Sequence, residues 1–339
     1  MRAMRVRQPA GLEHLVLDEG LASRSPGPGE VRVRIHASSL NYHDYVVASG
    51  YIPTPDGRIP MSDAGGVVLE VGPGVEGLAA GDRVMSLFFP EWIAGRATLE
   101  NIRTVPGDRA DGFAAEEVTV PAAWFTRAPA GYSHAEAATL TCAGLTAWRA
   151  LMVDGPLMPG QTVLVQGSGG VSVFALQFAK AAGACVIATS SSPAKLERLQ
   201  ALGADHVIDH KADAQWGRTA RKLTGGRGVD HVVEVGGAGN MEQTIAACAM
   251  GAHIALLGVL AGREGPVSTV RIMAQQLRLQ GLMVGSRQDQ LDMVRAVEAS
   301  GIRPVIDREF ALEALADAFR YQLAGRHFGK IVLRCAAEA

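Results

Sequence analysis

The pattern of apolar and polar positions changes near the middle of the chain. Up to about residue 127, apolar residues come in short runs separated by turns. In EVRVRIHASSL, the residues Val31, Val33 and Ile35 alternate with polar neighbours, which is the period-two pattern of a strand with one buried face. AGGVVLEVGPGV and AGDRVMSL continue this pattern, with a glycine–proline turn at residues 72–74. The first part of the chain therefore predicts a β-rich domain.

From about residue 132 the pattern becomes one of alternating helices and strands. SHAEAATLTCAGLTAWRALM favours a helix, with Ser133 as its N-cap and Glu136 completing a capping box. Six short, nearly all-apolar segments follow, most of them separated by helical segments: TVLVQG, CVIATS, HVIDH, DHVVEVGG, HIALLGVL and LRLQGLMVG. Strands buried on both faces have this composition. We therefore expect an α/β fold whose doubly wound parallel sheet has six strands, as in dinucleotide-binding domains.

Two further segments complete the predicted organisation. Residues from about 288 onward predict two helices and a final strand, FGKIVLRC, which returns to the first domain. Residues 88–111 show weak periodicity, and we interpret them as a surface excursion that could serve as a lid.

Composition limits the class of protein. The chain has 339 residues, of which 48% are hydrophobic, and a formal net charge of −2. This length allows two domains. The near-neutral charge gives no indication of a basic surface that would bind nucleic acid or anionic lipid. No secretory signal and no run of ~20 apolar residues is visible. The four cysteines are scattered, without a C-x-x-C pair: Cys142, Cys185, Cys248 and Cys335. We expect a cytoplasmic protein with reduced thiols.

A glycine-rich turn in the second part of the chain carries the first chemical signal. The segment VLVQGSGGVSVFALQFAKAAGACVIATSSS has the spacing G-x-G-x-x-S between a predicted strand and a predicted helix, the context of a dinucleotide-binding loop. Gly167 would allow the tight turn, and Gly169 would let the backbone approach a pyrophosphate at the helix N-terminus. Ser172 replaces the usual third glycine. The alternative is a turn that binds nothing.

The end of the second strand of this unit favours one cofactor. NAD-binding proteins place Asp or Glu there, where the carboxylate accepts hydrogen bonds from the ribose 2′-hydroxyl. This chain has Ser190, Ser191 and Ser192, followed by Lys195. Hydroxyl groups and a cation suit a phosphate dianion, so the pattern favours NADP(H) over NAD(H). A simpler and compatible interpretation is that Ser192 caps the helix that begins at Pro193.

Several segments, taken together and in order, resemble the medium-chain dehydrogenase/reductase superfamily: SLNYHDYVVASGYIP, DAGGVVLEVGPGVEGLAAGDRV, GLTAW, the glycine-loop segment, LGADHVIDH, GRGVDHVVEVGG and FGKIVL. Within it, the chain is similar to the zinc-free, quinone oxidoreductase-like branch. The resemblance implies a GroES-like β-barrel catalytic domain (1–130 and 287–339), a six-stranded Rossmann NADP-binding domain (131–286) and a cleft between them. It also implies a homodimer formed partly through the last Rossmann strand, around Leu279 to Val284.

The glycine loop, the strand ends and the resemblance together define a set of cofactor-binding candidates: Thr146, Gly167, Ser168, Gly169, Gly170, Val171, Ser190, Ser191, Lys195, His210, Gly236, Gly258 and Val259. Two of them have open alternatives. Thr146 is either close to the nicotinamide or simply buried in a helix. His210 either pairs with a 2′-phosphate or stacks beside the adenosine.

The metal ligands of zinc-dependent relatives are missing. Those enzymes bind the catalytic metal through a cysteine, a histidine and a second cysteine, and the corresponding positions here are Asn41, Ser62 and Cys142. One thiolate cannot make a three-ligand zinc site. No cysteine precedes Cys142, so the four-cysteine structural zinc site is missing too. We expect no metal, with an improvised site at His43 and Asp63 as the alternative.

The remaining candidates for chemistry lie in LNYHDYV. Without a Lewis acid, hydride transfer to a conjugated acceptor demands less of the protein than reduction of an isolated carbonyl. By the resemblance, Asn41 would donate its amide N–H to a carbonyl oxygen, and His43 would supply a proton. Tyr42 and Tyr45 are further candidates, and Asp44 would be a structural partner for nearby backbone. The alternatives are that Asn41 only caps a turn, that His43 is solvent-facing or structural, and that water supplies the proton.

The predicted function is NADPH-dependent, zinc-independent hydride transfer to a quinone, enone or other activated double bond. The partner would be a small carbonyl-conjugated substrate, with no nucleic acid or membrane involved. Two alternatives remain open: an alcohol dehydrogenase (aldehyde/ketone reductase) with a rebuilt metal site, and a non-catalytic NADPH-binding sensor or structural dimer.

Overall fold

The computed structural model describes residues 1–337, and the chain divides into two compact units. The first unit comprises Met1–Leu145 and the chain from Gly285 onward, and the second comprises Thr146–Val284. Residues 131–145, which we expected in the second domain, lie with the first unit. The reason is that helix α2 (His134–Thr139) packs against strand β3 (Glu30–Ser39) and its neighbours.

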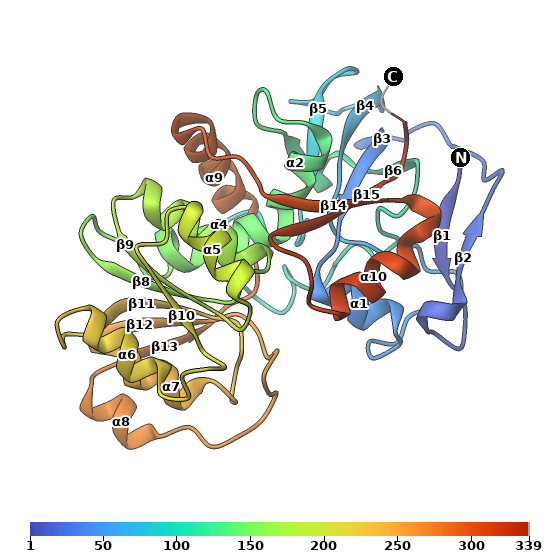
Figure 1. Cartoon of the computed structure of the whole chain (residues 1–339). Coiled ribbons are helices and arrows are strands. Elements are labelled where there is room, and N and C mark those ends of the chain that lie inside the picture. Colours follow the sequence, from blue (N-terminus) through green and yellow to red (C-terminus); the bar gives the residue numbers. More distant parts are fainter. Residues whose placement is uncertain (338–339) are drawn as a thin grey trace. The chain divides into compact units, whose positions relative to one another are not determined.

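The second unit contains the predicted six-stranded parallel sheet, in the order β10-β9-β8-β11-β12-β13. Its strands are β8 (Thr162–Gln166), β9 (Cys185–Ser190), β10 (His206–Asp209), β11 (Val229–Glu234), β12 (Cys248–Leu256) and β13 (Arg278–Gly281). Figure 1 shows α4 (Gly170–Ala181) and α5 (Pro193–Ala201) on one side of this sheet, and α6 (Trp216–Leu223) and α7 (Met241–Ala247) on the other. The strand order reverses beside β8, so the loop after β8 lies at the switch point where such sheets bind ligands.

Burial explains why these strands are apolar along their whole length. Leu164, Val232 and Ile254 pack on one face of the sheet with Trp216 of α6 and Ile245 of α7. Helix α8 (Thr269–Ala274) was not predicted. It buries no residue, so the apolar periodicity that reveals a helix is absent there.

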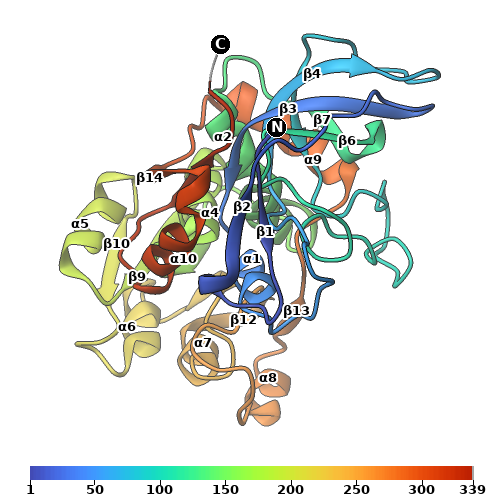
Figure 2. The same cartoon turned by 90° about the vertical axis from the view of Figure 1, so that its right-hand side faces the viewer.

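The first unit is built on a seven-stranded sheet. Its order is β14-β15-β3-β4-β5-β7, and β6 also pairs with β3. The further strands are β4 (Gly65–Val71), β5 (Arg83–Ser86), β6 (Glu117–Pro121), β7 (Phe125–Arg127), β14 (Ile306–Ala311) and β15 (Lys330–Arg334), with β1 (Ala3–Val6) and β2 (Leu15–Asp18) as a separate pair. Figure 2 shows the long strands β3 and β4 side by side. The apolar residues of β3 point into the core, as the alternation predicted.

The C-terminal part returns to the first unit, as predicted, because β15 pairs antiparallel with β3. The two predicted helices are α9 (Arg287–Ser300) and α10 (Leu315–Leu323). Strand β14 lies between them and was missed. The predicted N-cap at Ser133 and capping box with Glu136 are confirmed at α2. The long helix expected after it is interrupted by π-helical turns at 140–144 and 149–153, on either side of α3 (Leu145–Trp148).

The excursion at residues 88–111 is only partly a surface segment. Phe88, Phe89 and Trp92 are buried, with Phe89 in ring contact with both of the others. Leu99, in contrast, is 90% exposed. The segment therefore starts in the core and then runs over the surface. Among the helices of residues 1–337, none is long and apolar enough to cross a membrane.

Candidate active site

The first polar cluster forms around the start of α1 (Tyr42–Ala48), a short helix that the sequence pattern did not predict. Asn41 is its N-cap residue, and Asp44 is fully buried behind it. The two carboxylate oxygens of Asp44 accept hydrogen bonds from the backbone N–H of Asn41 at 2.8 Å and of Ser62 at 2.9 Å. The predicted structural role of Asp44 is confirmed: it ties the start of α1 to the segment before β4.

A buried lysine fixes the orientation of Asn41. Lys330, the first residue of β15, is 3% exposed. Its Nζ donates to Oδ1 of Asn41 at 2.6 Å and to the carbonyl oxygen of Leu40 at 2.7 Å. Only the amide oxygen can accept from an ammonium group, so the amide nitrogen must point the other way, where Nδ2 donates to Oγ of Ser62 at 3.3 Å. Sequence analysis missed Lys330, although a charged residue in the apolar run FGKIVL is a visible signal.

Two buried carboxyl groups, those of Asp63 and Asp44, interact electrostatically with the ammonium group of Lys330. Oδ2 of Asp63 lies 3.6 Å from Nζ of Lys330 and accepts a hydrogen bond from the hydroxyl of Ser39 at 2.6 Å. Burial raises the pKa of Asp63 to about 6; Lys330 opposes this rise, and the nearby charge of Asp44 adds to it. Burial likewise raises the pKa of Asp44 to about 6 against its hydrogen bonds. The cluster therefore changes its charge near neutral pH.

His43 lies two residues beyond Asn41, in a different environment. Its ring packs edge-on against Phe88, with the centroids 5.3 Å apart, and its Nε2 is 3.9 Å from Oδ2 of Asp108. Burial lowers the pKa of His43, against the opposing charge of Asp108. The expectation of a solvent-facing histidine does not hold, because the ring is largely buried. Asp108, from the excursion, was not identified from the sequence.

Tyr42 does not join this cluster as a buried group. It is 42% exposed, and its ring lies 5.8 Å from that of Tyr45. Tyr45 in turn packs on the core of the first unit.

The residues at the former metal positions do not fit zinc. The oxygen of Asn41 is occupied by an ammonium group, and its nitrogen cannot act as a ligand. Ser62 offers a neutral hydroxyl, and Cys142, which is not in a disulfide, would supply at most one thiolate. Over residues 1–337, no three His, Cys, Asp or Glu side chains are grouped so that they could hold a metal ion. The alternative metal site at His43 and Asp63 therefore lacks a third ligand among the described residues.

The second candidate region is the glycine loop after β8. Gly167 has a φ of 77°, a conformation that glycine adopts without strain, and Gly169 is the N-cap residue of α4. Ser168 lies in the turn, and Gly170 and Val171 are the first two residues of α4. Ser172 is buried and donates its hydroxyl hydrogen to the carbonyl oxygen of Gln166 at 2.6 Å. Serine thus replaces the third glycine by tying the helix back to the end of β8.

A buried network that sequence analysis missed supports this loop. Nε2 of Gln166 donates to Glu234 at 2.6 Å and to Thr244 at 2.7 Å, linking the ends of β8 and β11 to α7. The other oxygen of Glu234 accepts from the N–H groups of Gly236 and Gly237 at 2.7 and 2.9 Å. The carboxylate therefore fixes the loop after β11 relative to the glycine loop.

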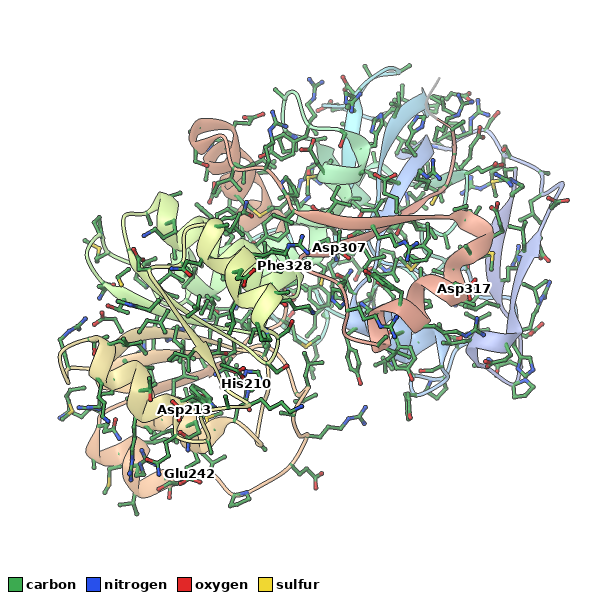
Figure 3. All side chains as sticks on the ribbon, in the orientation of Figure 1. His210, Asp213, Glu242, Asp307, Asp317 and Phe328 are labelled. Atoms are coloured by element: carbon green, nitrogen blue, oxygen red, sulfur yellow. The ribbon has the colours of Figure 1, made fainter. Side chains whose placement is uncertain are left out.

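The serines at the end of β9 lie beside the residue that follows β10. Ser190 is buried, and its carbonyl oxygen accepts from the N–H of His210 at 3.2 Å. Figure 3 shows His210 just beyond β10. The hydroxyl of Ser190 accepts from the N–H of Ser192 at 3.3 Å. Ser192 stands at the N-cap position of α5 with Pro193 following it, as the simpler interpretation predicted, but its side chain makes no capping hydrogen bond.

The serine group also includes Ser191, which is exposed, and Lys195, which is half-buried in the first turn of α5. Asp209, which is paired with Ser190 in the sheet, uses Oδ1 to accept from the N–H groups of Lys211 and Ala212.

The remaining cofactor candidates lie on several separate elements rather than in one loop. Gly236 and Gly258 both lie in crowded places. A Cβ at Gly258 would come within 2.6 Å of the carbonyl oxygen of Val235, and one at Gly236 would meet the side chain of Asn240. Val259 is 41% exposed in the loop after β12, and Thr146 is buried in α3. All of them belong to the second unit.

Comparison with known proteins decides the family. Residues 170–299 match the family model of zinc-binding dehydrogenases, and residues 27–130 match that of the alcohol dehydrogenase GroES-like domain. A zinc-type alcohol dehydrogenase-like protein of Schizosaccharomyces pombe is 39% identical over 333 residues, 96% of each chain. This chain belongs to the medium-chain dehydrogenase/reductase superfamily. Within the superfamily, the family that matches is that of the zinc-binding alcohol dehydrogenases.

Solved structures of superfamily members agree. The structure of an NAD-dependent alcohol dehydrogenase is 37% identical, with a TM-score of 0.91 over 99% of this chain and all of the other. Two mycobacterial structures, one of a quinone oxidoreductase and one complexed with NADPH, are 28% and 27% identical, each with a TM-score of 0.82 over 98% of this chain and 99% of theirs.

These matches confirm the predicted GroES-like and Rossmann-type fold and an oxidoreductase of this superfamily. NAD(P) binding is the property expected of such an enzyme, and the turn from Gly167 to Val171 at the start of α4 fits its pyrophosphate.

Proposed function

We propose that this enzyme uses NADPH to reduce an activated double bond, such as that of a quinone or enone, without a metal ion. The bound nicotinamide would supply the hydride. The chain's own residues bind and orient the acceptor and stabilise the negative charge that develops on its oxygen.

The observation that carries this proposal is the Lys330–Asn41 contact. The ammonium group withdraws electron density from the amide oxygen, which makes the amide N–H groups of Asn41 stronger hydrogen-bond donors. Because Lys330 fixes the orientation of the amide, the donor is positioned before substrate arrives. This arrangement can stabilise a developing enolate oxygen in a conjugated acceptor, which needs less stabilisation than an isolated carbonyl that relies on a Lewis acid.

His43 is the proposed source of the proton. Burial lowers the pKa of His43, so the imidazolium is the minor form at pH 7; that form gives its proton to the reduced acceptor and becomes the neutral ring. Asp108, 3.9 Å away, would stabilise the imidazolium form and so help the ring to take up the next proton. Tyr42, as an exposed hydroxyl beside these residues in sequence, remains a third candidate.

The preference for NADPH rests on the end of β9. Ser190, Ser191 and Lys195 replace the carboxylate that would bind a ribose 2′-hydroxyl and repel a 2′-phosphate. The mycobacterial structure with NADPH shows that a relative of this fold takes the phosphorylated cofactor, whereas the NAD-dependent relative shows that the fold accommodates both.

The test measures turnover with different acceptors, the zinc content of the protein and the effect of replacing Asn41. We expect purified protein to oxidise NADPH with a quinone or an enone, to be unaffected by EDTA, and to contain no stoichiometric zinc by elemental analysis. Asn41→Ala should lower kcat by ~10²-fold, the loss typical of one oxyanion donor, with NADPH affinity unchanged. The control Asn101→Ala removes an amide from a surface turn and should keep full activity. Tight NADPH binding without turnover on any acceptor would instead support the sensor alternative.

An alcohol dehydrogenase is the second candidate function. The 39% identical relative and the 37% identical solved structure are both named for that activity. Reversible oxidation of a simple alcohol, lost on chelation and restored by zinc, would favour this candidate over the first.

We also propose that the protein forms a homodimer through β13. Within the described residues β13 pairs only with β12, and all four of its residues are exposed. Leu279 and Met283 present apolar side chains at this edge, where an unpaired strand can accept another strand.

A further inference from the structure

A row of three basic side chains crosses the sheet of the second unit. His231 on β11 is in register with His253 on β12, and His253 is in register with Arg278 on β13. Registered residues on neighbouring strands point to the same face of a sheet, so the three side chains form one line. The row lies near the amino ends of these strands, opposite the edge that holds the glycine loop. The proposed hydride transfer uses none of these residues, although Arg278 also belongs to β13, the strand proposed to pair in the dimer.

The row lines a cavity of ≈ 260 Å³. Gln161 before β8, Asp230 on β11, and the segments Gly155–Pro156 and Met250–Ala252 complete its wall. The space is several times the ≈ 30 Å³ that one water occupies in the liquid, so it can hold a small ligand.

Three of the four ring nitrogens of His231 and His253 lack a hydrogen-bond partner. His253 is 4% exposed, and neither of its ring nitrogens has a partner. Nδ1 of His231 is also buried and unpartnered, while its Nε2 is 3.0 Å from Oε1 of Gln161. Buried polar atoms in proteins are almost always hydrogen-bonded, so three unpartnered nitrogens beside one cavity indicate a partner that comes from outside the chain.

Charge indicates the nature of that partner. Within residues 1–337 no carboxylate pairs with Arg278, whose guanidinium donates to the backbone carbonyl oxygen of Asp154 at 3.2 Å. Asp230 cannot balance it, because Arg227 contacts both of its oxygens and the N–H of Thr162 donates to it. The cavity is therefore lined by an exposed guanidinium without a carboxylate partner and by two imidazoles that can donate. No third His, Cys, Asp or Glu of the described chain completes a metal site there.

We propose that this cavity binds a tetrahedral oxyanion, a phosphate or phosphomonoester dianion, held by Arg278 and the ring N–H groups of His231 and His253. Guanidinium and imidazole donors match phosphate oxygens in charge and geometry. The site lies in the second unit alone and does not depend on the proposed function.

Binding should be coupled to proton uptake. Burial lowers the pKa of His231 to about 4, with His253 and Arg278 adding to the effect and Asp230 opposing it. Burial and Arg278 lower the pKa of His253, against Asp154. A dianion in the cavity would raise both values, so affinity for an anion of constant charge should increase as the pH falls.

The experiment is calorimetric titration of the full chain with sulfate, which stays a dianion across the pH range used. We expect saturable binding at one site per chain, tighter at pH 5.5 than at pH 7.5, together with shifts of the His231 and His253 ring resonances in NMR spectra. Arg278→Gln, a change at an exposed side chain, should weaken binding at least tenfold.

The control Lys195→Gln alters the proposed cofactor phosphate region and should leave sulfate binding unchanged. Inorganic phosphate and glycerol phosphate are then compared at pH 7.5. Tighter binding of the first indicates a site for the free ion, and tighter binding of the second indicates a site for a phosphorylated metabolite. Absence of saturable binding by any of these anions, binding unaffected by Arg278→Gln, or binding lost in Lys195→Gln would overturn the proposal.

Discussion

At the scale of single residues, Lys330 is the side chain on which the first polar cluster depends. Its ammonium group donates hydrogen bonds to Asn41 and to the carbonyl oxygen of Leu40, and it lies within ion-pair distance of Asp63. The side chain is almost completely buried. A buried ion pair adds little net stability when intact, but removal of one partner leaves an uncompensated charge.

Lys330→Met should therefore destabilise the protein by ~3 kcal/mol at pH 8, measured by urea unfolding. The folded pKa of Asp63, about 6, is already raised above the 3.8 of an unperturbed carboxyl, so its ionisation costs stability as the pH rises through 6. Without the ammonium this pKa should rise further. The loss should thus be smaller at pH 5, where Asp63 is protonated. The double variant with Asp63→Asn should show a weaker pH dependence, with Asp44 responsible for the remainder. Equal losses at both pH values in the single variant would contradict this explanation.

Ser190 is the residue that tests cofactor choice. Ser190→Asp places a carboxylate at the end of β9, where it would repel a 2′-phosphate and accept from a 2′-hydroxyl. We expect NADPH affinity to fall at least tenfold while NADH affinity holds or improves, measured by fluorescence titration. Ser300→Asp, at the end of α9, is the matched control. A variant that still prefers NADPH would show that the serines do not decide the choice.

At the scale of elements, close backbone packing fixes the helices on the sheet. Gly217 in α6 lies against α7, and a Cβ there would come within 2.1 Å of the carbonyl oxygen of Gln243. The helices would have to separate to accept any side chain.

Gly217→Ala should therefore destabilise the chain by ~2 kcal/mol or more, although alanine is the better helix former. Gly281→Ala is the matched control, since a Cβ at Gly281 meets nothing within 4 Å. Thermal unfolding of the two variants gives the comparison. Equal melting temperatures would mean that α6 and α7 can move apart at no cost.

At the scale of the whole molecule, the exposed edge of β13 predicts the oligomeric state. We expect a dimer by light scattering after size-exclusion chromatography. Leu279→Lys should shift it toward monomer, because a charged side chain at a strand edge opposes strand pairing. Leu99→Lys, at an apolar side chain that is 90% exposed, is the control and should remain dimeric. A wild-type protein that elutes as a monomer would contradict the proposed dimer.

The sequence by itself determined the local and repetitive features of this protein. Alternation marked β3, continuous apolar runs marked six buried strands, and the spacing of Gly167 and Gly169 marked the loop that begins α4. The capping pair Ser133 and Glu136 could be read because capping acts over three residues. Such features follow from neighbours along the chain, whose geometry is nearly fixed.

Only the tertiary structure decided which distant side chains meet. Lys330 and Asn41 are 289 residues apart in sequence yet bonded, and Glu234 reaches Gln166 across 68 residues. The row of His231, His253 and Arg278 exists only because three strands align in register. No local pattern encodes these contacts, since they depend on strand order and register, which the packing of the whole sheet sets. The short elements α1, α8 and β14 were missed for the same reason: their own residues specify them weakly, and their surroundings hold them in place.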